Sequence, residues 1–171
     1  HHKVEINQIK ITNNQHYFMK NKILAFVFSF VASMSLSTAW AYDFKVDSLY
    51  YTITSSTEPY TVEVAQDASY KAWTTVTLPN TVTNGGITYT VTGIAPYAFY
   101  QCQSLATITF PDSLDYIGDY SFSDCAFTEL VIPDKVTSIR GCAFEYCDQI
   151  TSVSLPDSLK ELRGHAFYGN H

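Results

Sequence analysis

Cysteines are the residues of this chain best suited to redox or metal chemistry, and there are four of them. Cys102, Cys125 and Cys147 recur at intervals of 23 and 22 residues. If this period reflects stacked coils, their side chains lie about 4.8 Å apart, whereas the Cβ atoms of a disulfide lie about 3.8 Å apart. We therefore expect three buried free thiols in the core, while Cys142, outside this register, could be exposed. No Cys-x-x-Cys pair occurs, so no metal site is predicted at the cysteines.

Three aspartates that each follow a proline form a second candidate site. Asp112, Asp134 and Asp157 would lie in a row along one edge of stacked coils, and such a row of carboxylates could bind calcium. The alternative is that each Pro-Asp pair opens a tight turn in which the carboxylate accepts backbone N–H groups. The sequence favours the turn, and no metal or other cofactor is predicted.

Catalytic side chains are scarce in this sequence. After residue 41 the only histidines are His165 and His171, so a serine or cysteine nucleophile has almost no base to activate it. Paired carboxylates would need a deep cleft, which a small repeat unit does not imply. Tyrosines such as Tyr97 and Tyr120 could stack on sugars or anchor a protein, although tyrosines of β-rich domains also pack simply as rings. We predict that the chain is not an enzyme.

The elements that would position these side chains follow a single period. Four classes of residue share intervals of 22 or 23 residues, and a period in the twenties predicts a solenoid. Their members are Phe99, Phe122, Phe144 and Phe167; Ile94, Ile117, Ile139 and Leu162; Cys102, Cys125, Cys147 and Asn170; and Pro111, Pro133 and Pro156. The four phenylalanines are expected to be buried, because stacking the units places them in a common core.

The pattern within one unit predicts its strand. Leu105-x-x-Ile108-x-Phe110 is typical of a leucine-rich repeat, and alternation directs Ile108 and Phe110 inward. Parallel strands are expected over 106–110, 129–132 and 151–155, and Phe127 is expected to replace the first leucine in the shorter middle unit. The predicted fold is a β-rich solenoid of leucine-rich-repeat type. It is a right-handed coil with a parallel strand wall, short turns or helical pieces opposite, and a β-rich N-terminal cap.

The segment ahead of the repeats divides into three parts. Residues 1–18 are interpreted as an upstream or non-structural extension. Residues 19–41 combine two lysines, an apolar stretch and the small-residue site Ala39-Trp40-Ala41, the pattern of a cleaved signal peptide; a retained membrane anchor would need about 20 apolar residues. Residues 42–75 are expected to form the cap of leucine-rich repeats over 76–171, with a hairpin at Asn84-Gly85-Gly86. The last unit stops before a strand, so we expect the natural protein to continue.

The charge of the chain excludes some partners. The first 41 residues hold four of the ten basic and one of the sixteen acidic side chains, which leaves 6 against 15, a net charge near −9, in the remainder. Such acidity argues against nucleic acid or an anionic membrane surface. No integral membrane span is expected after cleavage of the signal peptide.

Two stretches, "PDSLDYIGDYSFSDC" and "PDSLKELRGHAFYGN", resemble the BspA-like family of leucine-rich repeats over about residues 76–171. The departures are Cys142 and His165 before the Ala-Phe pair, and Ser121 where alanine is usual. This resemblance implies a bacterial surface or secreted protein, with adhesion reported for some members. No catalytic or ligand residue set defines the family, so none is carried over.

The function expected from these observations is binding of an extracellular protein or glycan by a secreted or cell-surface protein, with adhesion as the specific hypothesis. The alternatives are a targeting arm of a larger secreted enzyme and a structural spacer. The expected contact surface is the outward side of the strand wall, where short side chains leave a flat face that is cheap to desolvate. A packing requirement for small residues would explain the same pattern. The residues of this expected face are Thr107, Thr109, Glu129, Val131, Ser152 and Ser154.

Overall fold

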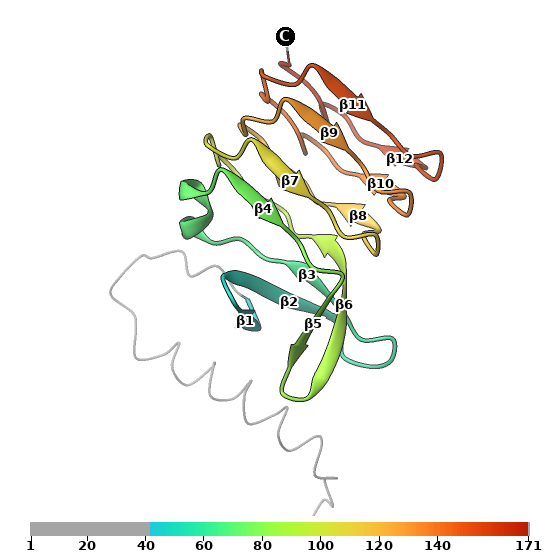
Figure 1. The fold of residues 1–171 in the computed structure, drawn as a ribbon. Helices are drawn as coiled ribbons and strands as arrows, with labels where there is room; N and C mark the ends of the chain where they lie inside the picture. Colours follow the sequence, from blue (N-terminus) through green and yellow to red (C-terminus); the bar gives the residue numbers. More distant parts are fainter. Residues whose placement is uncertain (1–41, 171) are drawn as a thin grey trace, which may run out of the picture. The chain divides into compact units, whose positions relative to one another are not determined.

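The computed structural model describes residues 42–170 of the chain (Figure 1). The predicted signal peptide at 19–41 and the extension at 1–18 lie outside these residues. Within the described part, no helix is long and apolar enough to span a membrane.

The described part begins with three strands that lie ahead of the repeats. β1 (Phe44–Val46) pairs antiparallel with β2 (Leu49–Ser55), and β2 pairs antiparallel with β3 (Thr61–Val64). Alternation along β3 buries Val62 and Val64, as expected for a strand with one face on the core. A short 3₁₀ helix, η1 (Ala68–Ala72), follows and is capped by the side chain of Asp67. Its Tyr70 is fully buried.

The hairpin expected around residue 84 is confirmed. β5 (Thr81–Asn84) and β6 (Ile87–Ile94) are antiparallel, with Asn84 paired to Ile87. The two turn residues are therefore Gly85 and Gly86, and both have a positive φ, at 59° and 82°. A two-residue turn that matches strand twist requires positive φ at both positions, which glycine adopts at no steric cost.

The predicted strand wall is present, and the structure adds an earlier strand to it. It consists of β4 (Thr75–Thr77), β7 (Thr107–Thr109), β9 (Glu129–Val131) and β11 (Ser152–Ser154). β4 pairs with β7, and β9 pairs with β11, both in parallel (Figure 1). The expected continuous stack is wrong between β7 and β9, which do not pair. The middle unit is one residue shorter at this point, and there the amide of Ala126 donates to the carbonyl of Leu105 at 3.1 Å.

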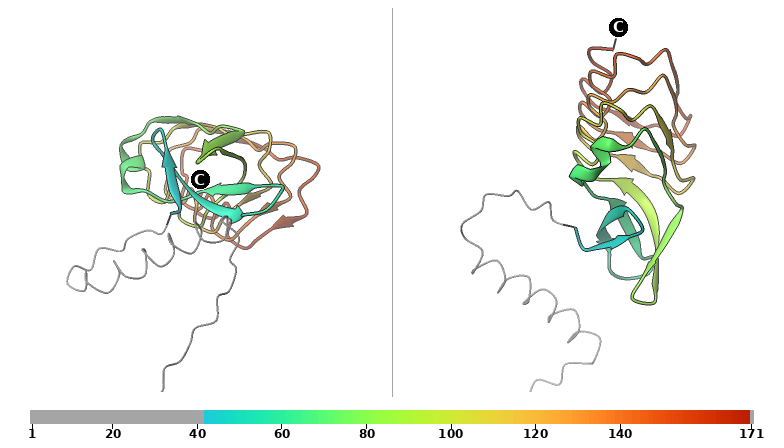
Figure 2. Two further views of the ribbon diagram at one scale, coloured as in Figure 1. Left: turned by 90° about the horizontal axis from the view of Figure 1, so that it is seen from below. Right: turned by 60° about the vertical axis from the view of Figure 1, so that its left-hand side comes forward.

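A second parallel ladder on another side of each coil was not expected from the sequence. In this ladder β6 pairs with β8 (Tyr116–Ile117), β8 pairs with β10 (Ser138–Ile139), and β10 pairs with β12 (Glu161–Leu162). All three pairs are parallel and in register. β3 also pairs in parallel with β6, so this ladder belongs to the same eight-stranded sheet as the first strands. The views in Figure 2 show the coils stacked along one axis, with the two ladders on different sides.

The turns that carry the phenylalanines are also joined from coil to coil. Each has two residues with positive φ, four positions apart, such as Tyr97 and Gln101 in the first complete coil. The amides of Tyr97, Phe99 and Gln101 donate to carbonyls of the next coil at 2.7–2.9 Å. Backbone polar groups must be paired when they are buried, and here the neighbouring coil supplies the partners. The structure has turns at these positions rather than helical pieces.

The core is a column of stacked aromatic rings. Phe99, Phe122, Phe144 and Phe167 stack with ring centroids 5.1–5.3 Å apart and interplanar angles of 7–8°. Tyr70 of η1 continues the column, with its ring centroid 4.9 Å from that of Phe99. The first three phenylalanines are fully buried, as predicted. Phe167 is only partly buried, which corrects the expectation for this residue, because no described coil covers its outer face.

Candidate functional site

All six residues of the expected contact face point outward and are exposed. Alternation explains this: the central residues Ile108, Leu130 and Val153 turn toward the core, so the residues on either side of each turn outward. The register sets Glu129 beside Ser152 and Val131 beside Ser154. We call Thr107, Thr109, Glu129, Val131, Ser152 and Ser154 the wall face.

Sequence reasoning missed two residues that extend the wall face. Thr75 and Thr77 of β4 are exposed and lie beside Thr107 and Thr109. Val76-Thr77-Leu78-Pro79 is similar to the later strand segments, and this similarity could have indicated a strand here. However, β4 lacks the leucine that opens those segments.

The chemistry of the wall face is that of short neutral side chains. Hydroxyl groups dominate, Glu129 adds one carboxylate, and Val131 is the most exposed apolar residue, at 72%. Lysine and arginine are absent from the exposed positions of β4, β7, β9 and β11. Such a surface has little rotamer entropy to lose on binding.

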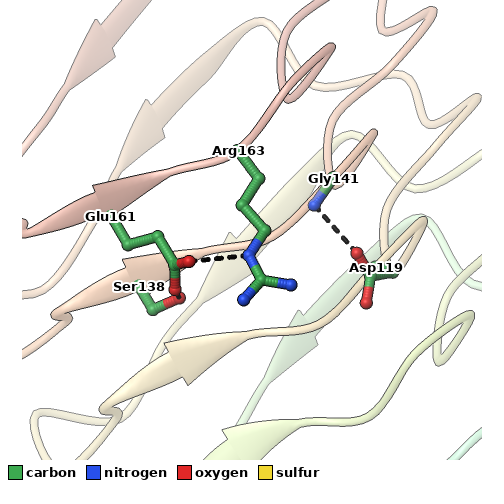
Figure 3. A network of polar contacts seen from close by, with 5 residues as sticks. All are labelled: Asp119, Ser138, Gly141, Glu161 and Arg163. Carbon is green, nitrogen blue, oxygen red and sulfur yellow. Dashed lines mark hydrogen bonds and ion pairs between the residues drawn. The ribbon is translucent and has the colours of Figure 1, made fainter.

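A polar network lies on the second ladder (Figure 3). Glu161 accepts hydrogen bonds from Arg163 Nε at 2.7 Å and from Ser138 Oγ, one coil earlier, at 2.8 Å. These two donors lower the pKa of the Glu161 carboxyl below its usual range, the arginine being the larger cause. Asp119 accepts from the backbone amide of Gly141 at 2.9 Å. The bond from Ser138 to Glu161 and the bond from Gly141 to Asp119 each cross a coil boundary, so the network joins neighbouring coils.

The four cysteines are free and buried. Cys102, Cys125 and Cys147 are unbridged, as the spacing predicted. Cys142 is also buried, at 7% exposure, which corrects the suggestion that it could be exposed. Burial raises the pKa of Cys102 to about 11 and that of Cys147 to about 12, and it also raises the pKa of Cys125. Because the thiolate is the reactive form, these thiols are poor nucleophiles at neutral pH.

The three Pro-Asp pairs form turns. In each, the proline carbonyl accepts a backbone hydrogen bond from the residue three positions later, as from Leu114 to Pro111 at 3.1 Å. The equivalent distances from Val136 and Leu159 are 3.0 and 3.2 Å. The aspartates themselves are exposed. Over residues 42–170, no group of three or more His, Cys, Asp or Glu side chains converges as a metal site would require.

The tyrosine rows are packed against each other. Tyr97 and Tyr120 stack with centroids 5.1 Å apart and rings within 4° of parallel. The neighbouring Cys142 side chain raises the pKa of the Tyr120 phenol to about 12. The facing sides of this stacked pair are therefore covered by each other and are not available to stack on a sugar. Tyr146 and Tyr168 remain more than half exposed, with His165 beside Tyr168.

Solved structures with the same fold come from several bacteria. A leucine-rich repeat protein from Bacteroides capillosus ATCC 29799 aligns with a TM-score of 0.62 at 25% identity, covering 70% of this chain and 86% of that one. The T. pallidum leucine-rich repeat protein aligns with a TM-score of 0.52 at 22% identity, covering 78% of this chain and 66% of that one. The pneumococcal vaccine antigen PcpA also gives 0.52, at 17% identity; the alignment covers 69% of this chain and 39% of that one.

The sequence comparisons agree with this fold. No curated protein matches the chain significantly. The family model described as a BspA type leucine-rich repeat region matches residues 70–171 in six copies, which is more than half of the chain. This match begins at Tyr70, the residue that opens the aromatic column. The chain therefore belongs to the BspA-type leucine-rich repeat family.

Proposed function

We propose that this protein is exported and binds an extracellular protein through its wall face, with adhesion as its role at the cell surface. The observation that carries the proposal is the exposure of all six wall-face residues on three successive strands. The export pattern at residues 19–41 and the net negative charge of the remainder support it. The right-handed winding and the capping role of residues 42–75 are part of the same proposal.

The wall face can bind a partner at a low desolvation cost. Thr107, Thr109, Ser152 and Ser154 present hydroxyl groups that exchange water for partner hydrogen bonds without a buried charge. Val131 offers an apolar contact among them. Stable interfaces bury about 800 Å² on each partner, so the contact would extend over more of the wall than these three strands. A protein is favoured over a glycan because stacked leucine-rich repeats form extended binding surfaces. The facing sides of Tyr97 and Tyr120, which cover each other, are also closed to a sugar.

The test is a triple substitution in the full chain, Thr109→Lys, Val131→Lys and Ser154→Lys. Three cations on a surface whose one other charge is the Glu129 carboxylate should abolish binding to whichever immobilised extracellular-matrix protein the unmodified chain binds. The control variant Ser56→Lys, Thr57→Lys and Gln149→Lys adds the same charge at exposed positions away from the wall face. Both variants should retain the circular dichroism spectrum of the unmodified chain.

If the wall-face variant and the control variant bind equally, the contact surface lies outside the wall face. Binding to a glycan array but to none of the matrix proteins would refute the choice of a protein partner. Detection of a catalytic reaction in the full-length protein would favour the targeting-arm alternative.

A further inference from the structure

An open groove of about 710 Å³ lies beside the first strand of the wall. Its sides come from three separate segments: the turn between β1 and β2, the strand β4, and the strand β5. Leu49 and Val82 are buried at its base, and Trp73 and Val76 are partly buried along it. The groove is therefore apolar at depth and bordered by threonines. It adjoins the wall face described above, because Thr75 and Thr77, which extend that face, also line the groove.

The edge of β4 that borders this groove has backbone groups with no strand partner. On its other edge, Thr74 O accepts from Ala106 and Thr107, and Leu78 N–H donates to Thr109 O. In a parallel ladder alternate residues bond to the same neighbouring strand, so the N–H and C=O groups of Val76, between Thr74 and Leu78, also face β7. The N–H and C=O groups of Thr75 and Thr77 therefore point away from β7. Among the described strands β7 is the only partner of β4.

An unpaired strand edge is a template for another strand, and proteins usually protect such edges with a lysine, a proline or a bulge. β4 itself is Thr75-Val76-Thr77, which contains no lysine, proline or bulge, and its shortness is the one such protection it has. The wall continues in parallel on the side of β7, so the groove occupies the position of one further strand. Main-chain pairing with an edge of this kind gives affinity, and pockets for alternate side chains give specificity.

Electrostatics favours a basic segment in the groove. Asp47 is the one charged residue among the groove residues, and it is exposed in the turn between β1 and β2. Residues 42–171 carry a net charge near −9, which attracts cationic segments over a distance. A second copy of this chain is disfavoured because it carries the same net charge.

We propose that this groove binds an extended segment of a partner protein, with alternating apolar and small polar residues and a lysine or arginine at one end. The segment pairs through its main chain with Thr75 and Thr77, places its apolar side chains over Leu49 and Val82, and sets its basic end beside Asp47. This site does not depend on the proposed function of the wall face.

The experiment measures binding of a defined probe to the full chain. The probe is acetyl-Lys-Thr-Val-Thr-Val-Thr-Lys-amide, followed by titration and by hydrogen exchange of individual amides. At a probe concentration ten times its Kd, exchange of the Thr75 and Thr77 amides should slow by roughly tenfold. The same peptide with every second backbone nitrogen methylated is prepared in both registers. The version that blocks the N–H groups facing β4 should not bind, and the version that blocks the other N–H groups should bind. A version with glutamate in place of both lysines should bind more weakly.

Variants of the chain separate the two parts of the proposal. Asp47→Asn removes the charge while keeping a residue type that tolerates the positive φ of 53° at this position, and it should weaken the lysine peptide by roughly two- to fivefold. Asp134→Asn, an exposed aspartate in a Pro-Asp turn outside the groove, is the matched control and should have no effect. Thr77→Pro removes one unpaired N–H and should abolish binding. The triple lysine variant of the wall face should bind the peptide normally.

Three outcomes would overturn the proposal. One is protection of amides elsewhere with none at Thr75 and Thr77. The second is equal binding of the methylated peptides, which needs no variant and therefore holds even if Thr77→Pro fails to fold. The third is sedimentation showing that the chain dimerises and that the peptide competes with the dimer, which would assign the groove to a second copy.

Discussion

The thiol of Cys147 donates a hydrogen bond to the carbonyl oxygen of Phe122, one coil earlier, at 3.1 Å. Cys125 makes the same bond to Phe99 at 3.3 Å. In the following coil Asn170 takes this position, and its Nδ2 donates to Phe144 at 3.2 Å. The recurring cysteine is therefore a buried donor to the backbone as well as a small core side chain. This explains why asparagine, the other residue type at the position, is a polar donor.

Thiol labelling tests the burial of the cysteines. In denaturant without reductant, all four cysteines should react with a thiol reagent, because none is bridged. In the native state at pH 7 the same reagent should label Cys102, Cys125 and Cys147 only at the rate of unfolding. Quantitative mass spectrometry of the peptides measures both. Loss of reactive thiols at these positions in denaturant would show that the cysteines are bridged.

Alkaline pH should destabilise the protein. The Cys102 thiol has its pKa raised by burial from an ordinary value of 9.0 to about 11, and Cys147 to about 12. Above pH 9 the unfolded chain therefore releases protons that the native chain retains, and the free energy of unfolding falls as pH rises toward 11. Urea unfolding at pH 7, 9 and 10 measures the change. Replacing both cysteines with alanine should lower the baseline stability but flatten this dependence, and an unchanged slope would contradict the assignment.

The aromatic column should be most sensitive at its centre. Phe122 contacts a ring on each side, so Phe122→Ala should cost about 3–5 kcal/mol. Phe167 stacks on one side only and is partly exposed, so Phe167→Ala should cost about half as much or less. Tyr146→Ala, which removes a ring that is 52% exposed, is the control. Chemical denaturation of the full chain gives the free energy of unfolding of the three variants. Equal losses of stability at Phe122 and Phe167 would contradict the partial exposure of the Phe167 ring.

Ser121→Ala should stabilise the protein. Ser121 occupies the position of Ala98, Ala143 and Ala166, and its hydroxyl is buried without a hydrogen-bond partner. An unsatisfied buried polar group costs about 1–3 kcal/mol, so its removal should raise the unfolding free energy by about 1 kcal/mol or more. Ala143→Ser, the reverse change in the next coil, should lower it. A loss of stability in Ser121→Ala would indicate a partner for the hydroxyl.

Gly93 should not tolerate a side chain. The ring of Tyr116 lies directly over it, so a methyl group there would overlap the ring. Tyr116 also donates a hydrogen bond to Glu63 at 2.6 Å, which links β8 of the repeats to β3. Gly93→Ala should therefore displace Tyr116 and cost about 1–3 kcal/mol. Gly164→Ala, where no atom lies within 4 Å of the added methyl, should cost far less. Thermal unfolding compares the two, and similar melting temperatures would contradict this packing.

The sequence alone was enough to predict the repeat, the wall strands β7, β9 and β11, and the burial of Phe99, Phe122 and Phe144, because one period recurs at four classes of position. It did not predict the second ladder, since two-residue strands such as β8 and β10 are too short to show alternation. The expectation of a continuous strand wall was wrong, because one missing residue in the middle unit removes the pairing between β7 and β9. The wall-face side chains were placed correctly on the surface, and their role in binding stays a prediction.

The groove beside β4 could not have been found from the sequence. Its sides are 46–49, 75–77 and 81–83, which carry no shared motif and meet only through the pairing of β1 with β2 and of β5 with β6. The thiol hydrogen bonds were missed for a related reason. A spacing shows that the cysteines lie in a column, but it does not show that each reaches the carbonyl of the preceding coil.

The hydrogen bonds between coils run along the stacking axis, which determines how the repeats respond to mechanical force. A pull on the two ends of the repeat segment loads these bonds in tension, so the joints between coils should break one after another, the weakest first, rather than shear together. Each released unit of about 23 residues would lengthen the chain by roughly 75 Å. The first break is expected between β7 and β9, where strand pairing is absent. Under load the repeat segment would therefore lengthen in steps of one coil. One missing residue in the middle unit determines which joint between coils is the weakest.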